Sequence, residues 1–412
     1  MLNRIPYLKE FSSKSQRFLL TIAFQDFLRW SSFIWIFFSN YIKAIGVNYK
    51  DYAILVAFWS LSVIIFSVPA GALSDILTRK QSIFIGRSFF VIAILLFLIF
   101  PSFIGIALGM ISWGISDSFI FAGQDPLTYE YLKENNELEK YPKGFAFLTS
   151  VKNLSVAVGA LLAGVAANLD LKYVMIGSLF NAVILLLTTF VLPKVRQVGI
   201  GEKKESNILG SIRDGMKIVK ESKIIKLLIF FVLSTTATYA AISEFYTLTL
   251  EKVGFSYSIV GIIIVFESLF YVTSGYIYSH TKLKDLKETD IMKISVSILL
   301  LGFSSIILGT PISVVAGFFI CRIAFAFIEN SYMNILQKNA DNKVRATIMS
   351  FVMLPRNIVN IVLSFGVGVV IDKGFYFESF LIPTTVAFSF LFFLIILGNK
   401  VTLAKDKDKI LG

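Results

Sequence analysis

Long apolar runs alternate with short polar interruptions along almost the whole chain. The runs reach about 20 residues or more, which is the length that an α-helix needs to cross a hydrocarbon core of roughly 30 Å. They predict an all-α integral membrane protein with twelve transmembrane helices. The predicted spans are 18–43, 51–73, 82–100, 103–131, 144–167, 172–192, 225–250, 258–279, 292–309, 312–337, 344–371 and 378–398.

One long polar segment separates the sixth span from the seventh. It predicts an N-terminal six-helix bundle over residues 1–192, a cytoplasmic linker over 193–224 and a C-terminal six-helix bundle over 225–412. Within the linker, apolar residues recur at helical spacing with basic residues between them. This pattern is typical of an amphipathic helix on a membrane surface.

An internal repeat supports the division into two halves. "YIKAIGVNYKDYAILVAF", residues 41–58, corresponds to "TLEKVGFSYSIVGIIIVF", residues 249–266. Each copy places a Gly after one span, then a short polar turn, then the next apolar run. "VPAGALSD" and "VTSGYIYS" correspond in the same way at the ends of the second and eighth spans. Two pseudo-symmetric bundles suit a protein that moves one half against the other around a central site.

Charge adds an orientation. The net charge is +12, although only 16% of residues are charged. Lys and Arg gather in both tails and in the loops on the same side as the tails. The opposite loops hold only Lys43, Lys50, Lys172, Lys252 and Lys373. The positive-inside rule then predicts that both termini are cytoplasmic. We expect a multi-pass protein of the plasma membrane. Because topology accounts for the positive charge, no nucleic-acid partner is expected.

The composition also argues against several kinds of chemistry. Cys321 is the single cysteine and His280 the single histidine, so neither an intrachain disulfide nor a His/Cys metal site is expected. The chain contains no G-x-x-x-x-G-K-[ST] loop, so ATP is not expected to drive it directly. We expect no enzyme activity, no metal and no cofactor. A cleavable signal peptide is not expected either, because the first apolar run is too long.

The stretch "VPAGALSDILTRK", residues 68–80, resembles the G-x-L-x-D-x-x-G-R-R/K signature between helices 2 and 3 of the major facilitator superfamily. Two positions depart from the family's usual residues: Ile76 stands where a basic residue is usual, and Thr78 stands where Gly is usual. "SDSFIFAGQDPLTYEYL" and "KVRATIMSF" resemble helix 4 and the entry to helix 11 in its bacterial drug-efflux members. The resemblance implies that Asp75 caps helix 11 and that Arg79 pairs with Glu130. The resulting gating set is Gly71, Asp75, Arg79, Lys80, Glu130 and Arg345.

Several charges fall inside the predicted spans, where each costs about 2.5–3.5 kcal/mol. They are Asp26, Arg29, Asp117, Glu267, Arg322, Glu329, Glu244, Arg87 and Arg356. One interpretation is that they form internal ion pairs; Arg29, at i+3, could be the partner of Asp26. The other is that they line a substrate cavity in which a carboxylate carries a proton. Asp26 is the first candidate, because the resemblance places helix 1 along that cavity.

These observations favour a proton-coupled secondary transporter that exports small lipophilic compounds, such as drugs or toxic metabolites, by alternating access. It would act as an antiporter and a monomer, with a small molecule, the proton and the lipid bilayer as its partners. Aromatic residues near the charges, among them Trp30, Tyr239 and Tyr271, would suit apolar or cationic substrates, while the arginines would suit an anionic group. Two alternatives stay open: transport of one dedicated metabolite or lipid in either direction, and a non-transporting sensor or immunity protein.

Overall fold

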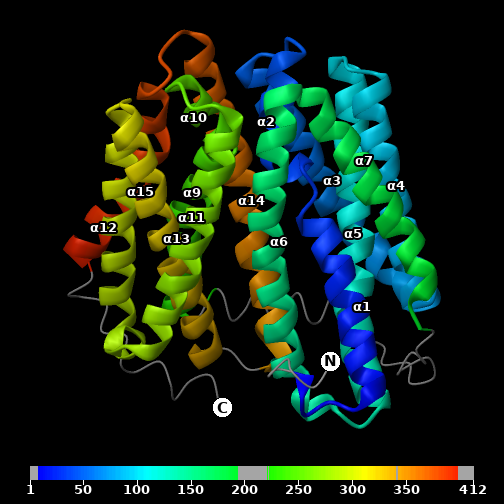
Figure 1. The fold of residues 1–412 in the computed structure, drawn as a ribbon. Helices are drawn as coiled ribbons and strands as arrows, with labels where there is room; N and C mark the ends of the chain where they lie inside the picture. The colour runs from blue at the N-terminus through cyan, green and yellow to red at the C-terminus, as the bar shows by residue number, and fades with distance from the viewer. Residues whose placement is uncertain (1–7, 194–219, 221, 340–341, 398–412) are drawn as a thin grey trace. The chain divides into compact units, whose positions relative to one another are not determined.

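The computed structural model describes residues 8–193, 220, 222–339 and 342–397, and the regular elements in these ranges are helices joined by short turns (Figure 1). The predicted linker lies largely outside the described residues. The helices are α1 (Ser13–Trp30), α2 (Ile34–Ala44), α3 (Tyr49–Ile76), α4 (Arg79–Ile99), α5 (Phe103–Glu134), α6 (Tyr141–Leu169), α7 (Leu171–Thr188), α9 (Lys223–Ser243), α10 (Tyr246–Lys252), α11 (Tyr257–His280), α12 (Glu288–Ile307), α13 (Pro311–Asn339), α14 (Asn342–Asp372) and α15 (Leu381–Leu397). Short 3₁₀ turns join them: η3 (Leu138–Lys140), η4 (Thr189–Val191), η5 (Lys282–Asp285) and η6 (Glu378–Phe380).

Within the described ranges, 11 helices are long and apolar enough to cross a membrane. The span predicted at 18–43 is not among them: it is broken into α1, which contains four charged residues, and α2, which has only 11 residues. The break leaves backbone groups without helical partners, and side chains supply them. Ser178 Oγ accepts from the Ile34 N–H at 2.8 Å, and the Trp35 indole N–H donates to the Arg29 carbonyl at 3.1 Å. Such replacement is required wherever backbone is irregular at membrane depth.

The seventh predicted span is broken in the same way, into α9 and α10, at Glu244 and Phe245. The repeat recognised in the sequence continues beyond this break. Gly46 after α2 and Gly254 after α10 have φ of 91° and 94°, a conformation that glycine adopts without a steric penalty. In both copies the residue after the Gly donates its N–H five residues back, to Ile42 or to Leu250. The two copies therefore share a backbone turn as well as a sequence pattern.

The described chain divides into two compact units. Unit 1 comprises Met1–Val47, Ile54–Lys203 and Ser256–Val265, and unit 2 comprises Asn48–Ala53, Lys204–Phe255 and Phe266–Gly412. In each unit the long helices run alongside one another (Figure 1). Close pairs depend on glycine: at Gly302 of α12 a Cβ atom would lie 2.9 Å from the Gly317 carbonyl oxygen of α13. At Gly317, a Cβ would lie 2.7 Å from the carbonyl oxygen of Gly302.

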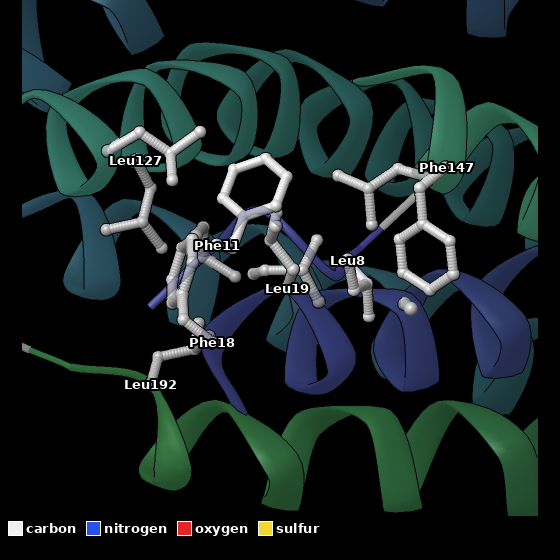
Figure 2. Close-up of a cluster of buried hydrophobic side chains, with 12 residues drawn as sticks. Leu8, Phe11, Phe18, Leu19, Leu127, Phe147 and Leu192 are labelled. Atoms are coloured by element: carbon white, nitrogen blue, oxygen red, sulfur yellow. The ribbon is translucent and has the colours of Figure 1, made fainter. Parts of the chain in front are cut away.

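A hydrophobic cluster closes the end of unit 1 at which α1 begins. Figure 2 shows its side chains coming from the segment before α1, from α1 itself and from the neighbouring helices. Phe18 stacks on Tyr131 of α5 with ring centroids 3.8 Å apart. The Gln16 amide donates to the Leu8 and Phe11 carbonyls, both at 3.0 Å, and so holds the preceding segment over the cluster. The cluster is formed by Leu8, Phe11, Phe18, Leu19, Ile22, Ala23, Ile83, Leu127, Leu132, Phe147, Leu148 and Leu192.

Candidate functional site

The main polar contact inside unit 1 is an ion pair between α1 and α5. Arg29 Nη2 lies 2.8 Å from Asp117 Oδ1, and the two side chains are 8% and 4% exposed. The second carboxylate oxygen of Asp117 accepts from the Trp59 indole N–H of α3 at 3.0 Å. The Arg29 guanidinium also lies 5.6 Å from the centre of the Trp30 ring. Asp117 therefore joins α1, α3 and α5 through one carboxylate.

The sequence suggested Asp26 as a possible partner of Arg29, and the structure places Asp117 of α5 in an ion pair with Arg29. Spacing along one helix could only suggest a partner three residues away, whereas the contact runs across to α5. Among its contacts, Asp26, which is 1% exposed, accepts from the Gln124 side-chain amide at 2.6 Å. The helices α1, α5 and α6 enclose a small pocket here, with room for about one water molecule. Its polar lining includes Asp26, Gln124, Thr128 and Lys152.

Arg87 of α4 is 2% exposed, and its hydrogen-bond acceptors are neutral. Nη1 donates to the Leu185 carbonyl at 2.9 Å and to Thr189 Oγ1 at 2.8 Å, and Nη2 donates to Gln25 Oε1 at 2.8 Å. These contacts attach α4 to the point where α7 passes into η4, and to α1. They favour a structural role for Arg87 within the predicted set.

In unit 2 a second pair of charges lies on α11 and α13, and it is held more loosely. Arg322 Nε lies 3.9 Å from Glu267 Oε1, with side chains 26% and 12% exposed. Nη1 donates to the Tyr239 hydroxyl at 3.4 Å. The guanidinium carbon lies 4.5 Å from the centre of the Tyr271 ring. Glu329 is also in this cluster, because its carboxylate accepts from the Tyr271 hydroxyl.

Two further predicted residues of unit 2 lie at the break after α9 and near the middle of α14. Glu244 follows α9, and its carboxylate accepts from the Tyr52 hydroxyl at 3.2 Å. Arg356 follows Pro355 within α14 and donates to the Asn357 side chain at 3.1 Å. Neither of these contacts involves Glu267, Arg322 or Glu329, which lie together around Tyr271.

The predicted pairing of Arg79 with Glu130 is present. Arg79 Nη2 and Nε donate to Glu130 Oε1 at 2.9 and 3.1 Å, and Arg79 Nη1 donates to the Ser74 carbonyl at 3.1 Å. Lys80 donates to the Phe190 and Leu192 carbonyls at 2.7 and 2.8 Å.

Thr78 explains how the chain turns there without the usual Gly. Its hydroxyl accepts from the Gln81 N–H and the Gln81 side chain accepts from the Thr78 N–H, which makes a capping box at the start of α4. Gly71 lies in α3, the helix that precedes this turn. The side chains of Asp75 and Arg345 lie outside the described residues, and so does the predicted cap on helix 11.

Several residues of these sites were not predicted. Gln124 and Trp59 contact carboxylates, Lys152 lines the pocket, and Gln25 holds Arg87. All four lie in predicted spans; Gln25, Trp59 and Gln124 are uncharged and give only a weak signal there, whereas Lys152 is charged and could have been selected on the same ground as the other intramembrane charges. The available signal was position: Gln25 directly precedes Asp26.

Comparison with known proteins decides the family. The model of the Major Facilitator Superfamily matches residues 19–364. The chain belongs to this superfamily. Its members are transporters rather than enzymes, and the all-α membrane fold expected from the sequence is confirmed.

Individual relatives are distant. The chain is 25% identical over 244 residues to the "Uncharacterized MFS-type transporter YxaM" of Bacillus subtilis (strain 168), a match covering 56% of this chain and 57% of that one. The crystal structure of a mutant of the nucleoside transporter NupG is 15% identical, with a TM-score of 0.77 and coverage of 92% of this chain and 98% of that one. A POT family transporter in complex with 5-aminolevulinic acid is 14% identical, with a TM-score of 0.68 and coverage of 97% and 99%. These structures share the fold.

Proposed function

We propose that this superfamily member is a proton-coupled secondary transporter that exports small, largely apolar molecules across the plasma membrane, with both termini in the cytoplasm. The observation that carries the proposal is the set of carboxylates buried in membrane helices, above all Asp26. Charges at this depth are costly, and they are typical of ion and proton pathways. The export direction rests on the similarity of residues 116–132 and 343–351 to drug-efflux members.

Asp26 is the best-placed proton carrier among these carboxylates. Asp117 is fixed by Arg29 and Trp59, so protonating it would break a buried ion pair. Asp26 accepts from a neutral amide and lines a pocket with room for about one water. Proton transfer at Asp26 through a water in this pocket would leave the Arg29–Asp117 pair intact. Lys152 in the same lining favours release of the proton when the pocket is open.

Arg79 and Glu130 are proposed as the latch of the gating motif. Their contact joins the start of α4 to the inner half of α5 and draws the end of α3 in through Ser74. A contact made in only one of two conformations shifts the equilibrium between them. A free-energy difference of about 1.4 kcal/mol changes the ratio of their populations tenfold.

Liposomes that contain the purified protein and an internal pH-sensitive dye test the coupling. An imposed pH gradient should drive accumulation of a lipophilic dye in the wild type, and addition of the dye should move protons. Asp26→Asn should abolish both effects. Asp285→Asn, the same change at the exposed end of η5, should preserve them. Coupled transport that survives in Asp26→Asn would refute the assignment of Asp26, and the absence of proton movement in the wild type would refute proton coupling. Transport that proceeds only in the inward direction would refute export.

A further inference from the structure

Arg322 is short of hydrogen-bond acceptors. An arginine side chain carries five N–H donors in a planar fork. Arg322 Nε has no hydrogen-bond partner within the ranges that the structure describes, and its 3.9 Å separation from Glu267 is beyond hydrogen-bond distance. The Tyr239 hydroxyl accepts from Nη1 only at 3.4 Å. Arg29 in unit 1 pairs with its carboxylate at 2.8 Å, so the loose contact is particular to unit 2.

Aromatic rings hold the Arg322 guanidinium in place. Its carbon lies 4.5 Å from the Tyr271 ring centre and 5.9 Å from that of Phe325. Tyr239 stacks on Phe325 with ring centres 4.4 Å apart. A guanidinium stacked on rings directs its N–H groups outward in its own plane, where a planar carboxylate can accept two parallel hydrogen bonds. The same rings offer an apolar surface to the rest of a ligand.

We infer that Arg322 binds the carboxylate of an amphipathic organic anion. When this ligand is absent, the Glu267 carboxylate lies beside the Arg322 guanidinium in its place. The inference rests on the proposed transport function and names its substrate class. A ligand carboxylate at hydrogen-bond distance would satisfy the Nε donor that Glu267 leaves without a partner. The apolar body of the ligand would then pack against Tyr239, Tyr271 and Phe325.

The role given to Glu267 makes the inference testable in two directions. An internal carboxylate competes with the ligand for one guanidinium, so removing it should strengthen binding. A purely structural ion pair predicts the opposite, because Glu267→Gln would leave Arg322 buried without its counter-ion and would disturb the site. The sign of the change in affinity therefore distinguishes the two roles.

Isothermal titration of the purified full-length protein with three aryl carboxylates of increasing length, such as benzoate, 3-phenylpropionate and 4-phenylbutyrate, provides the test. Their amides and amines serve as matched probes. We expect at least one carboxylate to bind tenfold or more tightly than its amide and its amine. Glu267→Gln should raise carboxylate affinity several-fold. Arg322→Lys should lower it about tenfold, because an ammonium group cannot make the paired contact.

The double variant Arg322→Gln/Glu267→Gln removes both charges together and so avoids leaving one buried alone. It should fold and show no preference for carboxylates. Lys373→Gln removes a positive charge from the exposed surface of unit 2 and should bind as the wild type does. Equal binding of the amide or the amine, weaker binding in Glu267→Gln, a preference that persists in the double variant, or no carboxylate binding in the wild type would each overturn the inference.

The outcome is separable from that of the proposed function. Selective binding without proton-driven transport would contradict the coupling and support the anion site. Proton-driven transport of a neutral dye without carboxylate binding would contradict the anion site alone.

Discussion

Asp117→Asn should destabilise unit 1 by about 3 kcal/mol. The substitution leaves the Arg29 guanidinium in a nearly dry site without a counter-charge, and breaking a buried pair from one side costs about 3–5 kcal/mol. The lower end applies because an Asn oxygen can still accept from Trp59, which lies 3.0 Å from Asp117. The side-chain exposures of 8% and 4% leave water little room to replace the lost charge.

The double variant Arg29→Gln/Asp117→Asn should recover much of this loss. Neutral amides in both positions can bond to each other, and no charge is left alone. We therefore expect a coupling energy of about 2 kcal/mol or more from the double-mutant cycle. Glu139→Gln, which neutralises an exposed carboxylate in unit 1, is the matched control and should change stability by no more than about 0.5 kcal/mol.

Tryptophan fluorescence suits the assay unusually well. All four tryptophans of the chain, Trp30, Trp35, Trp59 and Trp113, lie in unit 1. Equilibrium unfolding in mixed detergent micelles, followed by this signal, therefore reports on the unit that contains the pair. A coupling energy near zero, or an Asp117→Asn variant as stable as Glu139→Gln, would refute the view that the pair holds α1 to α5.

Three further predictions concern contacts at the end of unit 1 at which α1 begins. Arg79→Gln and Glu130→Gln should each lower the initial transport rate in liposomes several-fold, and the charge exchange Arg79→Glu/Glu130→Arg should restore part of it; full activity in the single variants would contradict the latch. Burial alone would raise the pKa of the Glu137 carboxyl, but hydrogen bonds from Ser15, Ser12 and Lys140 outweigh it and lower the pKa from 4.5 to about 2. The stability that Glu137 contributes is therefore complete above pH 4.5 and is lost as the pH falls toward 2, so Glu137→Gln should cost about 2–3 kcal/mol at pH 7 and progressively less below pH 4.5 in unfolding titrations. Thr78→Ala should cost about 1 kcal/mol through the lost cap, whereas Thr78→Gly should cost only a few tenths; equal costs would rule out the capping box.

The membrane helices can be predicted from the sequence because a segment crosses the membrane according to its own hydropathy, which depends only on the residues of that segment. The repeat predicts two matching turns, and Gly46 and Gly254 confirm them with nearly equal φ. The breaks after Trp30 and Ser243 were not predicted. Both runs stay apolar across the break, and the groups that satisfy the freed backbone, such as Ser178, lie on other helices.

Contacts between helices are harder to predict for a physical reason. Hydropathy places a charge at a depth, but the partner depends on how each helix is rotated about its axis. Arg29 and Asp117 are 88 residues apart, and nothing in either span marks them as partners. The pairing of Arg79 with Glu130 could be predicted only because the resemblance to the family motif implies this contact.

The repeat duplicates the backbone but not the charges. In unit 1 the ion pair joins α1 to α5 and is closed at 2.8 Å, while in unit 2 it joins α11 to α13 and stays open at 3.9 Å. A closed pair with an adjacent carboxylate in a pocket suits a proton site, because the charge on Arg29 is already balanced. An open pair stacked on aromatic rings suits a ligand anion, because the charge on Arg322 is still available. The proton and the ligand would then bind to different units, so Asp26→Asn should change coupling without changing carboxylate preference, and the Arg322 variants should do the reverse.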